Sequence, residues 1–232
     1  GGLLGRPVEL KYYDDKSDPS EVPGIYTKLL DVDKADLVVS GYATNQIAPA
    51  MPVVVRKGKA FISLFGLDVN DKFKYPKYFS IIPTGQDTKG SFTKGFFDIA
   101  AAQSPKPKTV AFTYADAEFA QNACEGARAN AKKHGFQTVY DKAYPPPPKT
   151  TDFAPIVRAI KALEPDLVVA CAYPLDSVGL VLAASEIGLK PKMFGGAMVG
   201  LQATFFKDKL KNKMNGIVNY ETWVPDDKQM YK

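Results

Sequence analysis

Long hydrophobic runs are missing from this 232-residue chain. No stretch approaches the roughly 18 to 20 uninterrupted apolar residues of a membrane span. The first residues, Gly1 to Pro7, also lack the basic and then apolar layout of a secretory signal peptide. We therefore expect a mature or trimmed globular chain that does not itself span a membrane.

Cysteine and histidine are scarce, with two cysteines and one histidine. Cys124 lies in a helical pattern and Cys171 at a strand end, without zinc-ligand spacing or a Cys-x-x-Cys pair. We expect two buried free thiols; the alternative is one disulfide, if the compartment is oxidising. His134 precedes Gly135 at a helix end, where a partner of the helix dipole is expected rather than a catalytic base.

Enzyme signatures are also missing. No G-x-G-x-x-G follows a strand, and there is neither a Walker A loop nor a G-x-S-x-G elbow. Acid pairs occur at Asp14-Asp15 and Asp226-Asp227, but adjacent loop carboxylates are usually solvated. We expect no enzyme, no cofactor and no metal. A metal at Asp14 and Asp15, or an active site assembled from scattered residues, is the alternative.

The net charge of +5 does not come with a compact basic patch, because lysines and acids are interspersed. We therefore expect no nucleic-acid partner. The chain is 45% hydrophobic and 24% charged, which is typical of a globular protein.

Short apolar or β-branched runs alternate with amphipathic helical stretches, which predicts βαβ units and a parallel α/β fold. The expected strands cover residues 8–13, 35–40, 60–64, 78–82, 109–114, 138–144, 166–172, 192–195 and 216–220. The expected helices cover residues 21–30, 45–56, 88–103, 118–133, 153–163, 177–187 and 202–207. A break at Pro83 to Asp87 is interpreted as a connection between lobes.

Five loops follow these strands, and they carry aromatic, small and uncharged polar residues. They cover residues 42–46, 65–68, 115–119, 173–177 and 196–200. In parallel α/β sheets ligands bind beyond the carboxyl ends of the strands, so the loops predict a cleft for a small ligand, and the N–H groups that start the following helices favour an anion.

Several segments carry a family resemblance through their order and spacing. They are residues 1–10 leading to Asp14-Asp15, 35–41 followed by 48–50, 78–83 with Asp87 and Gly90, 151–153, and 164–169. The chain resembles the periplasmic solute-binding proteins of ABC transporters, of the branched-chain amino-acid-binding type. The resemblance implies a type I periplasmic-binding-protein fold, with two hinged lobes of parallel sheet flanked by helices. It also implies a periplasmic location and a membrane permease as partner.

Relative to the family pattern, the chain starts without the first strand and helix and stops near the second crossing between lobes. We therefore expect a fragment. Residues 1–87 would form a partial N-terminal lobe, residues 88–221 the second lobe, and residues 222–232 the start of a crossover.

The resemblance also implies the ligand contacts. The loop after Gly41 and the loop from Phe65 to Leu67 would take a ligand carboxylate, Phe119 would cover it, and Tyr173 and Met198 would complete the far wall. The candidate ligand-binding residues are Tyr42, Thr44, Asn45, Phe65, Leu67, Phe119, Tyr173 and Met198.

The ligand class follows from one departure from the family. Amino-acid binders typically carry an acid near the position of Met198, whereas residues 194–200 contain none. A buried ammonium without a partner costs several kcal/mol. We therefore expect a small carboxylate with an aromatic or apolar body. The alternatives are an amino-acid or amide binder that uses Asp176 or Glu118, and a ligand-sensing domain of a receptor or regulator.

Overall fold

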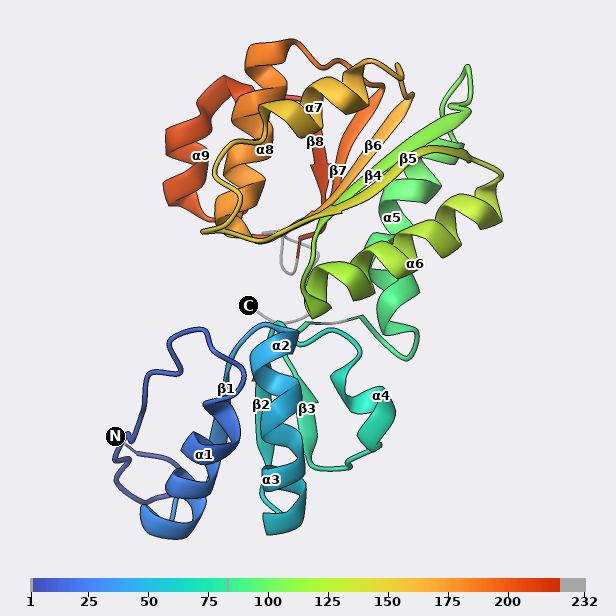
Figure 1. Ribbon diagram of the computed structural model, residues 1–232. Coiled ribbons are helices and arrows are strands. Elements are labelled where there is room, and N and C mark those ends of the chain that lie inside the picture. The colour runs from blue at the N-terminus through green and yellow to red at the C-terminus, as the bar shows by residue number, and fades with distance from the viewer. Residues whose placement is uncertain (1, 83, 222–232) are drawn as a thin grey trace. The chain divides into compact units, whose positions relative to one another are not determined.

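The computed structural model describes residues 2–82 and 84–221, which fall into two compact units, Gly1–Pro83 and Thr84–Lys232. We call them the first and second unit. Each contains one parallel sheet flanked by helices, which confirms the expected α/β class (Figure 1). The division falls within the predicted connection at residues 83–87, and the expected crossover at residues 222–232 lies outside the described residues.

The first unit holds a three-stranded sheet in the order β1-β2-β3. The strands are β1 (Val38–Tyr42), β2 (Phe61–Leu64) and β3 (Tyr78–Ser80). The helices are α1 (Val22–Thr27), continued by a π-helix at Lys28–Val32; α2 (Thr44–Ile47), continued through a 3-10 turn at Ala48–Ala50 into α3 (Met51–Lys57); and α4 (Val69–Phe73).

The two faces of this sheet differ in burial. Val38 and Phe61 are register partners and belong to a core with Tyr26 of α1 and Met51 of α3. On the other face Val39, Ile62 and Phe79 are aligned across the strands and are 56%, 41% and 56% exposed. Parallel sheets are normally covered on both faces. Within the described residues, this apolar face of the sheet has no such cover.

The expected strand at residues 8–13 is wrong. The segment has no strand conformation, and Val8, Leu10 and Tyr12 are 66%, 77% and 81% exposed. Alternating side chains favour a strand, but a strand also needs a neighbour to accept and donate its main-chain hydrogen bonds. No described strand pairs with this segment. Helix α4, conversely, is too short for its sequence to show a helical period.

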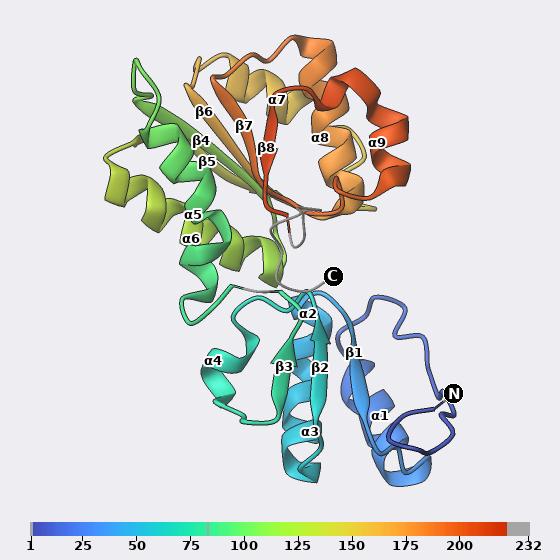
Figure 2. The ribbon, with the colours of Figure 1, turned by 180° about the vertical axis from the view of Figure 1, so that it is seen from behind.

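The second unit holds a five-stranded sheet in the order β5-β4-β6-β7-β8. The strands are β4 (Thr109–Ala115), β5 (Gln137–Tyr144), β6 (Leu167–Ala172), β7 (Met193–Met198) and β8 (Ile217–Asn219). The helices are α5 (Thr88–Ala101), α6 (Glu118–His134), α7 (Ala154–Lys161), α8 (Pro174–Ile187) and α9 (Thr204–Leu210), with a 3-10 turn at Lys211–Met214. Helices α5 and α6 cover one face, and α7, α8 and α9 the other (Figures 1 and 2).

Helix ends in this unit follow the sequence signals. Gly135 ends α6 with φ 77°, as expected from its glycine, and His134 lies in the last turn with its Nε2 3.3 Å from Asp98 Oδ1. At the start of α7, Asp152 Oδ1 accepts a hydrogen bond from Ala154 N at 2.9 Å. The predicted position of His134 at a helix end is confirmed.

The expectation of free thiols is wrong, because Cys124 of α6 and Cys171 of β6 form a disulfide. Their Cα atoms lie 5.9 Å apart although 47 positions separate them in the sequence. Helix α6 packs across β6, so the two sulfurs meet inside the unit, and both cysteines are fully buried. The disulfide that the sequence left as the alternative is the state found.

Asp166 joins the first residues of three neighbouring strands. Its Oδ2 accepts hydrogen bonds from Lys108 N at 2.7 Å and Thr109 N at 3.2 Å, and its Oδ1 lies 3.1 Å from Lys192 Nζ. Its own main-chain N–H donates to Thr109 Oγ1 at 2.9 Å. Partial burial raises the pKa of this carboxyl, but the main-chain donors and Lys192 outweigh it, and the net pKa is lowered.

We predict that Asp166→Asn lowers the free energy of unfolding by about 2 kcal/mol at neutral pH, since a charged acceptor of several hydrogen bonds is lost. Because the folded-state pKa is depressed, this stabilisation is present above the unfolded-state pKa of about 4 and is lost as the pH falls through the folded value. Urea denaturation at pH 7 and pH 3 measures both effects. Asp208→Asn, at an exposed position of α9, is the control. An equal loss in both variants would contradict the assignment.

Candidate ligand-binding surfaces

Three non-glycine residues at the carboxyl ends of β1 and β2 have positive φ. Ala43 has φ 72° and ψ 160°, and Phe65 and Asp68 have φ 57° and 65°. These conformations are sparsely populated by residues with a Cβ, and such strain collects at ligand-binding and active sites. These three of the ten described non-glycine residues with positive φ fall in the two loops that the sequence predicted to hold a ligand.

Two hydroxyls tie these loops together. Thr44 Oγ1 accepts a hydrogen bond from Leu67 N at 2.9 Å, and both residues are completely buried. Ser40 Oγ accepts from Leu64 N at 2.6 Å and donates to Gly41 O at 2.7 Å. The side chains of Thr44 and Ser40 therefore fix the shape of the loops through the main chain of Leu67 and Leu64.

Tyr42, Asn45 and Phe65 lie on the more accessible side of the same loops. Tyr42 is 41% exposed, and its ring centroid lies 5.6 Å from that of Phe65. Asn45 and Phe65 are half-buried. The structure thus brings together all five candidate residues of the first unit, with the aromatic and amide groups nearer to solvent than Thr44 and Leu67.

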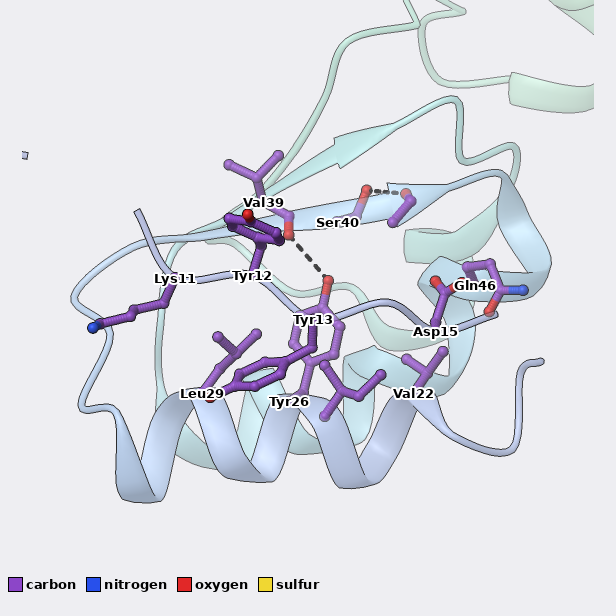
Figure 3. Close-up of a pocket in the computed structure, with 12 residues that line it drawn as sticks. Lys11, Tyr12, Tyr13, Asp15, Val22, Tyr26, Leu29, Val39, Ser40 and Gln46 are labelled. Atoms are coloured by element: carbon purple, nitrogen blue, oxygen red, sulfur yellow. Dashed lines mark hydrogen bonds between the residues drawn. The ribbon is translucent and has the colours of Figure 1, made fainter. Parts of the chain in front are cut away.

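A separate hollow of about 170 Å³ lies between residues 11–15, α1 and β1 (Figure 3). Tyr26 crosses it and donates to Val39 O at 3.0 Å; burial raises the pKa of Tyr26 to about 12. Asp15 beside it accepts a hydrogen bond from Ser17 N at 2.8 Å. Among the described residues no group of three or more His, Cys, Asp or Glu could hold a metal ion. The alternative of a metal at Asp14 and Asp15 thus gains no support.

In the second unit, aromatic rings form a continuous row at the carboxyl edge of the sheet. Phe119 lies 5.8 Å from Tyr173 and 5.7 Å from Phe92, whose ring lies 4.4 Å from that of Tyr220. The sequence indicated Phe119 and Tyr173 but missed Phe92, which lies inside a helix, and Tyr220. The strand-end rule, applied to β8, would have found Tyr220.

Met198 ends β7 beside the end of β6, in register with Ala172. Met198 is completely buried, and the side chain of Asn219 makes two hydrogen bonds to its main chain. Met198 N donates to Asn219 Oδ1 at 2.9 Å, and Asn219 Nδ2 donates to Met198 O at 2.6 Å. Asn219, which the sequence analysis did not single out, therefore fixes the position of Met198.

Asp176 and Glu118, the two acids kept as possible ammonium partners, differ in burial. Glu118 in the first turn of α6 is exposed, whereas Asp176 in the first turn of α8 is completely buried. Tyr144 Oη donates to Asp176 Oδ2 at 2.9 Å. Burial raises the pKa of Asp176, against a lowering by Tyr144 and by main-chain N–H groups. Burial and the neighbouring charge of Asp176 also raise the pKa of Tyr144.

Residues 1–230 match a family model described as periplasmic binding protein. The chain belongs to the periplasmic binding protein family. This match confirms the resemblance seen in the sequence. In the part of the chain that the structure describes, no helix has the length and apolar character needed to cross a bilayer.

Curated relatives in this family include the Leu/Ile/Val-binding protein homolog 8 of Brucella abortus and its counterpart in Brucella suis. Each is 23% identical over 211 residues, which are 88% of this chain and 51% of the relative. The chain spans about half the length of the curated relatives it matches.

Solved structures of ABC transporter solute-binding proteins share the fold. One is a protein from R. palustris in complex with 4-hydroxybenzoate, with 22% identity, a TM-score of 0.68 and coverage of 84% of this chain and 52% of that one. Another is a branched-chain amino acid transporter substrate binding protein from Streptococcus pneumoniae in complex with isoleucine. It has 21% identity, a TM-score of 0.74 and coverage of 94% of this chain and 60% of that one.

Proposed function

We propose that the protein is the extracytoplasmic solute-binding component of an ABC importer and captures a small carboxylate with an aromatic or apolar body. The aromatic row of the second unit carries the proposal, because the half-buried ring of Tyr173, which packs against the buried ring of Phe119, offers an apolar surface to a ligand. The strained loops after β1 and β2 support it as the carboxylate-holding surface. Binding without catalysis, a periplasmic location and a membrane permease as partner are parts of the same proposal.

Solved structures of this fold include binders of both ligand classes, aromatic acids and amino acids. One protein of this fold is in complex with 4-hydroxybenzoate and another with isoleucine. The lack of an acid in residues 194–200 favours a ligand without an ammonium. A specific observation also favours the second candidate, an amino-acid or amide binder, because the buried carboxyl of Asp176 follows Tyr173 by three positions.

We predict that an aromatic acid such as benzoate raises the melting temperature of the purified protein, since a ligand at about 100 times its Kd stabilises the folded state by about 2.7 kcal/mol. Tyr173→Ala should weaken this binding about tenfold or more, because the half-buried ring loses its contact with the ligand. Thermal shift and calorimetric titration measure the two effects.

Phe205→Ala is the matched aromatic control, since Phe205 of α9 is 70% exposed, and it should leave the Kd unchanged. Stabilisation by leucine or isoleucine but by no acid lacking an amine would establish the amino-acid alternative and exclude the first ligand class. Stabilisation by neither class would exclude both.

A further inference from the structure

The carboxyl of Asp176 has one oxygen that the fold leaves unused. The residue is completely buried, and Tyr144 Oη bonds to Oδ2 at 2.9 Å. Oδ1 is also buried and has no hydrogen-bond partner among the described residues. Buried polar oxygens in folded proteins nearly always have partners. We therefore expect Oδ1 to accept a hydrogen bond from a donor that is not among the described residues.

The position of Asp176 relates it to the proposed ligand contacts. It lies in the first turn of α8, three positions after Tyr173, which begins the helix where β6 ends. The ring of Tyr173 contacts Phe119, and Met198 ends the neighbouring strand β7. Asp176 thus belongs to the same carboxyl edge of the sheet as the aromatic row.

Surrounding contacts fix this carboxyl in place. Phe153 packs edge-on against Tyr144, with ring centroids 5.5 Å apart. One helical turn after Asp176, a Cβ added to Gly179 would lie 2.4 Å from the ring of Phe153, so α8 lies directly against that ring. Tyr144 O also accepts a hydrogen bond from Asp116 N at 2.7 Å. The carboxyl of Asp176 is therefore held on α8 against Tyr144 of β5.

The charge of Asp176 has no cationic partner among the described residues. The groups that act on it are Tyr144 from β5 and the main-chain N–H groups of Tyr173 and Asp176 itself. Two more buried polar atoms at this edge also lack partners within the described part, Gln202 Oε1 after β7 and Tyr220 Oη after β8. Buried polar atoms without a hydrogen-bond partner among the described residues therefore follow each of the adjacent strands β6, β7 and β8.

We propose that Asp176 is a specificity-determining residue that accepts a hydrogen bond from a donor on the bound ligand, either a hydroxyl or an ammonium. This inference rests on the proposed function and narrows its ligand class to carboxylates that carry such a donor. A purely structural role as the acceptor for Tyr144 Oη accounts for Oδ2 but leaves Oδ1 without a hydrogen-bond partner among the described residues.

Two ligand pairs that differ in the donor test the inference. Benzoate and 4-hydroxybenzoate differ by a hydroxyl, and 4-methylpentanoate and leucine differ by an ammonium. The Kd of each is measured calorimetrically for the wild type, Asp176→Asn, Asp176→Ala and Asp116→Asn. Asp116 is an exposed acid at the same edge, bonded to Gln121 Nε2 at 2.7 Å, and serves as the matched control.

We expect the donor-bearing member of one pair to bind the wild type about tenfold or more tightly than its partner, which is the effect of one hydrogen bond to a charged acceptor. Asp176→Asn should remove a preference for an ammonium and weaken a preference for a hydroxyl, because the charged acceptor is lost. When the amide oxygen accepts from Tyr144 Oη, an NH2 group takes the place of Oδ1, and this group cannot accept from an ammonium and can only donate to a hydroxyl. Asp116→Asn should keep the preference. A preference within the benzoate pair would identify the donor as a hydroxyl, and a preference within the leucine pair would identify it as an ammonium.

Equal binding within both pairs by the wild type would overturn the inference and leave the proposed function standing. A preference that persists in Asp176→Asn and Asp176→Ala would also overturn it. If Asp176→Ala fails to fold, the test rests on Asp176→Asn, which keeps the shape of the side chain. An undiminished preference in that variant would overturn the inference. Failure of all four compounds to bind the wild type would overturn the proposed function, and the inference with it.

Discussion

Replacing Cys124 and Cys171 together by alanine should lower the free energy of unfolding by about 4 kcal/mol. The disulfide closes a loop across 47 positions, and such a cross-link restricts the unfolded chain in proportion to the logarithm of loop length. Both side chains are fully buried, so alanine leaves no unpaired polar group. Urea denaturation of the oxidised protein and of the double variant measures the difference.

The control is a reducing agent, which should destabilise the wild type by a similar amount and leave the double variant unchanged. Cys124 and Cys171 join α6 to β6, and Phe119 and Tyr173 belong to the first turn of α6 and the end of β6. Ligand affinity should therefore fall together with stability. Equal stability of the wild type with and without reductant would contradict the prediction.

The sequence predicted the parallel sheets because burial in this fold follows local patterns. Strand β6 is buried along its whole length and appears in the sequence as an unbroken apolar run. The segment at residues 8–13 has an equally clear alternation and forms no strand. The difference lies in whether a neighbouring strand is present, which no local pattern reports.

The candidate loops were predictable for a topological reason. Ligand-binding loops follow the carboxyl ends of parallel strands, and the position of a strand fixes the position of its loop. The bond between Thr44 and Leu67 joins two such loops. Asp176 and Asn219 differ, because their roles depend on Tyr144 and Met198, 32 and 21 positions away. The disulfide likewise depends on how α6 crosses β6.

Gly195→Ala should be nearly as damaging, because the main chain of β8 leaves no room for a side chain at Gly195 of β7. Gly195 is in register with Val218, and a Cβ added there would lie 2.0 Å from Val218 O. Its φ of 145° also disfavours a side chain. The strands must separate to admit the methyl group, which we expect to lower the free energy of unfolding by about 3 kcal/mol.

Gly135→Ala separates the two causes of this loss. Gly135 also has positive φ, 77°, but no atom lies within 4 Å of an added Cβ. This control should cost only about 1 kcal/mol, the ordinary penalty of a left-handed conformation. The excess loss in Gly195→Ala, measured by urea denaturation, then reports the close approach of the strands.

That approach also places Asn219, the last residue of β8, against the main chain of Met198. Gly195→Ala should therefore weaken ligand binding at temperatures where the variant remains folded, whereas Gly135→Ala should not. Equal losses of stability in the two variants would mean that β8 yields to the methyl group without strain. Met198 would then keep its position through β6 alone, since Ala172 pairs with it from the other side.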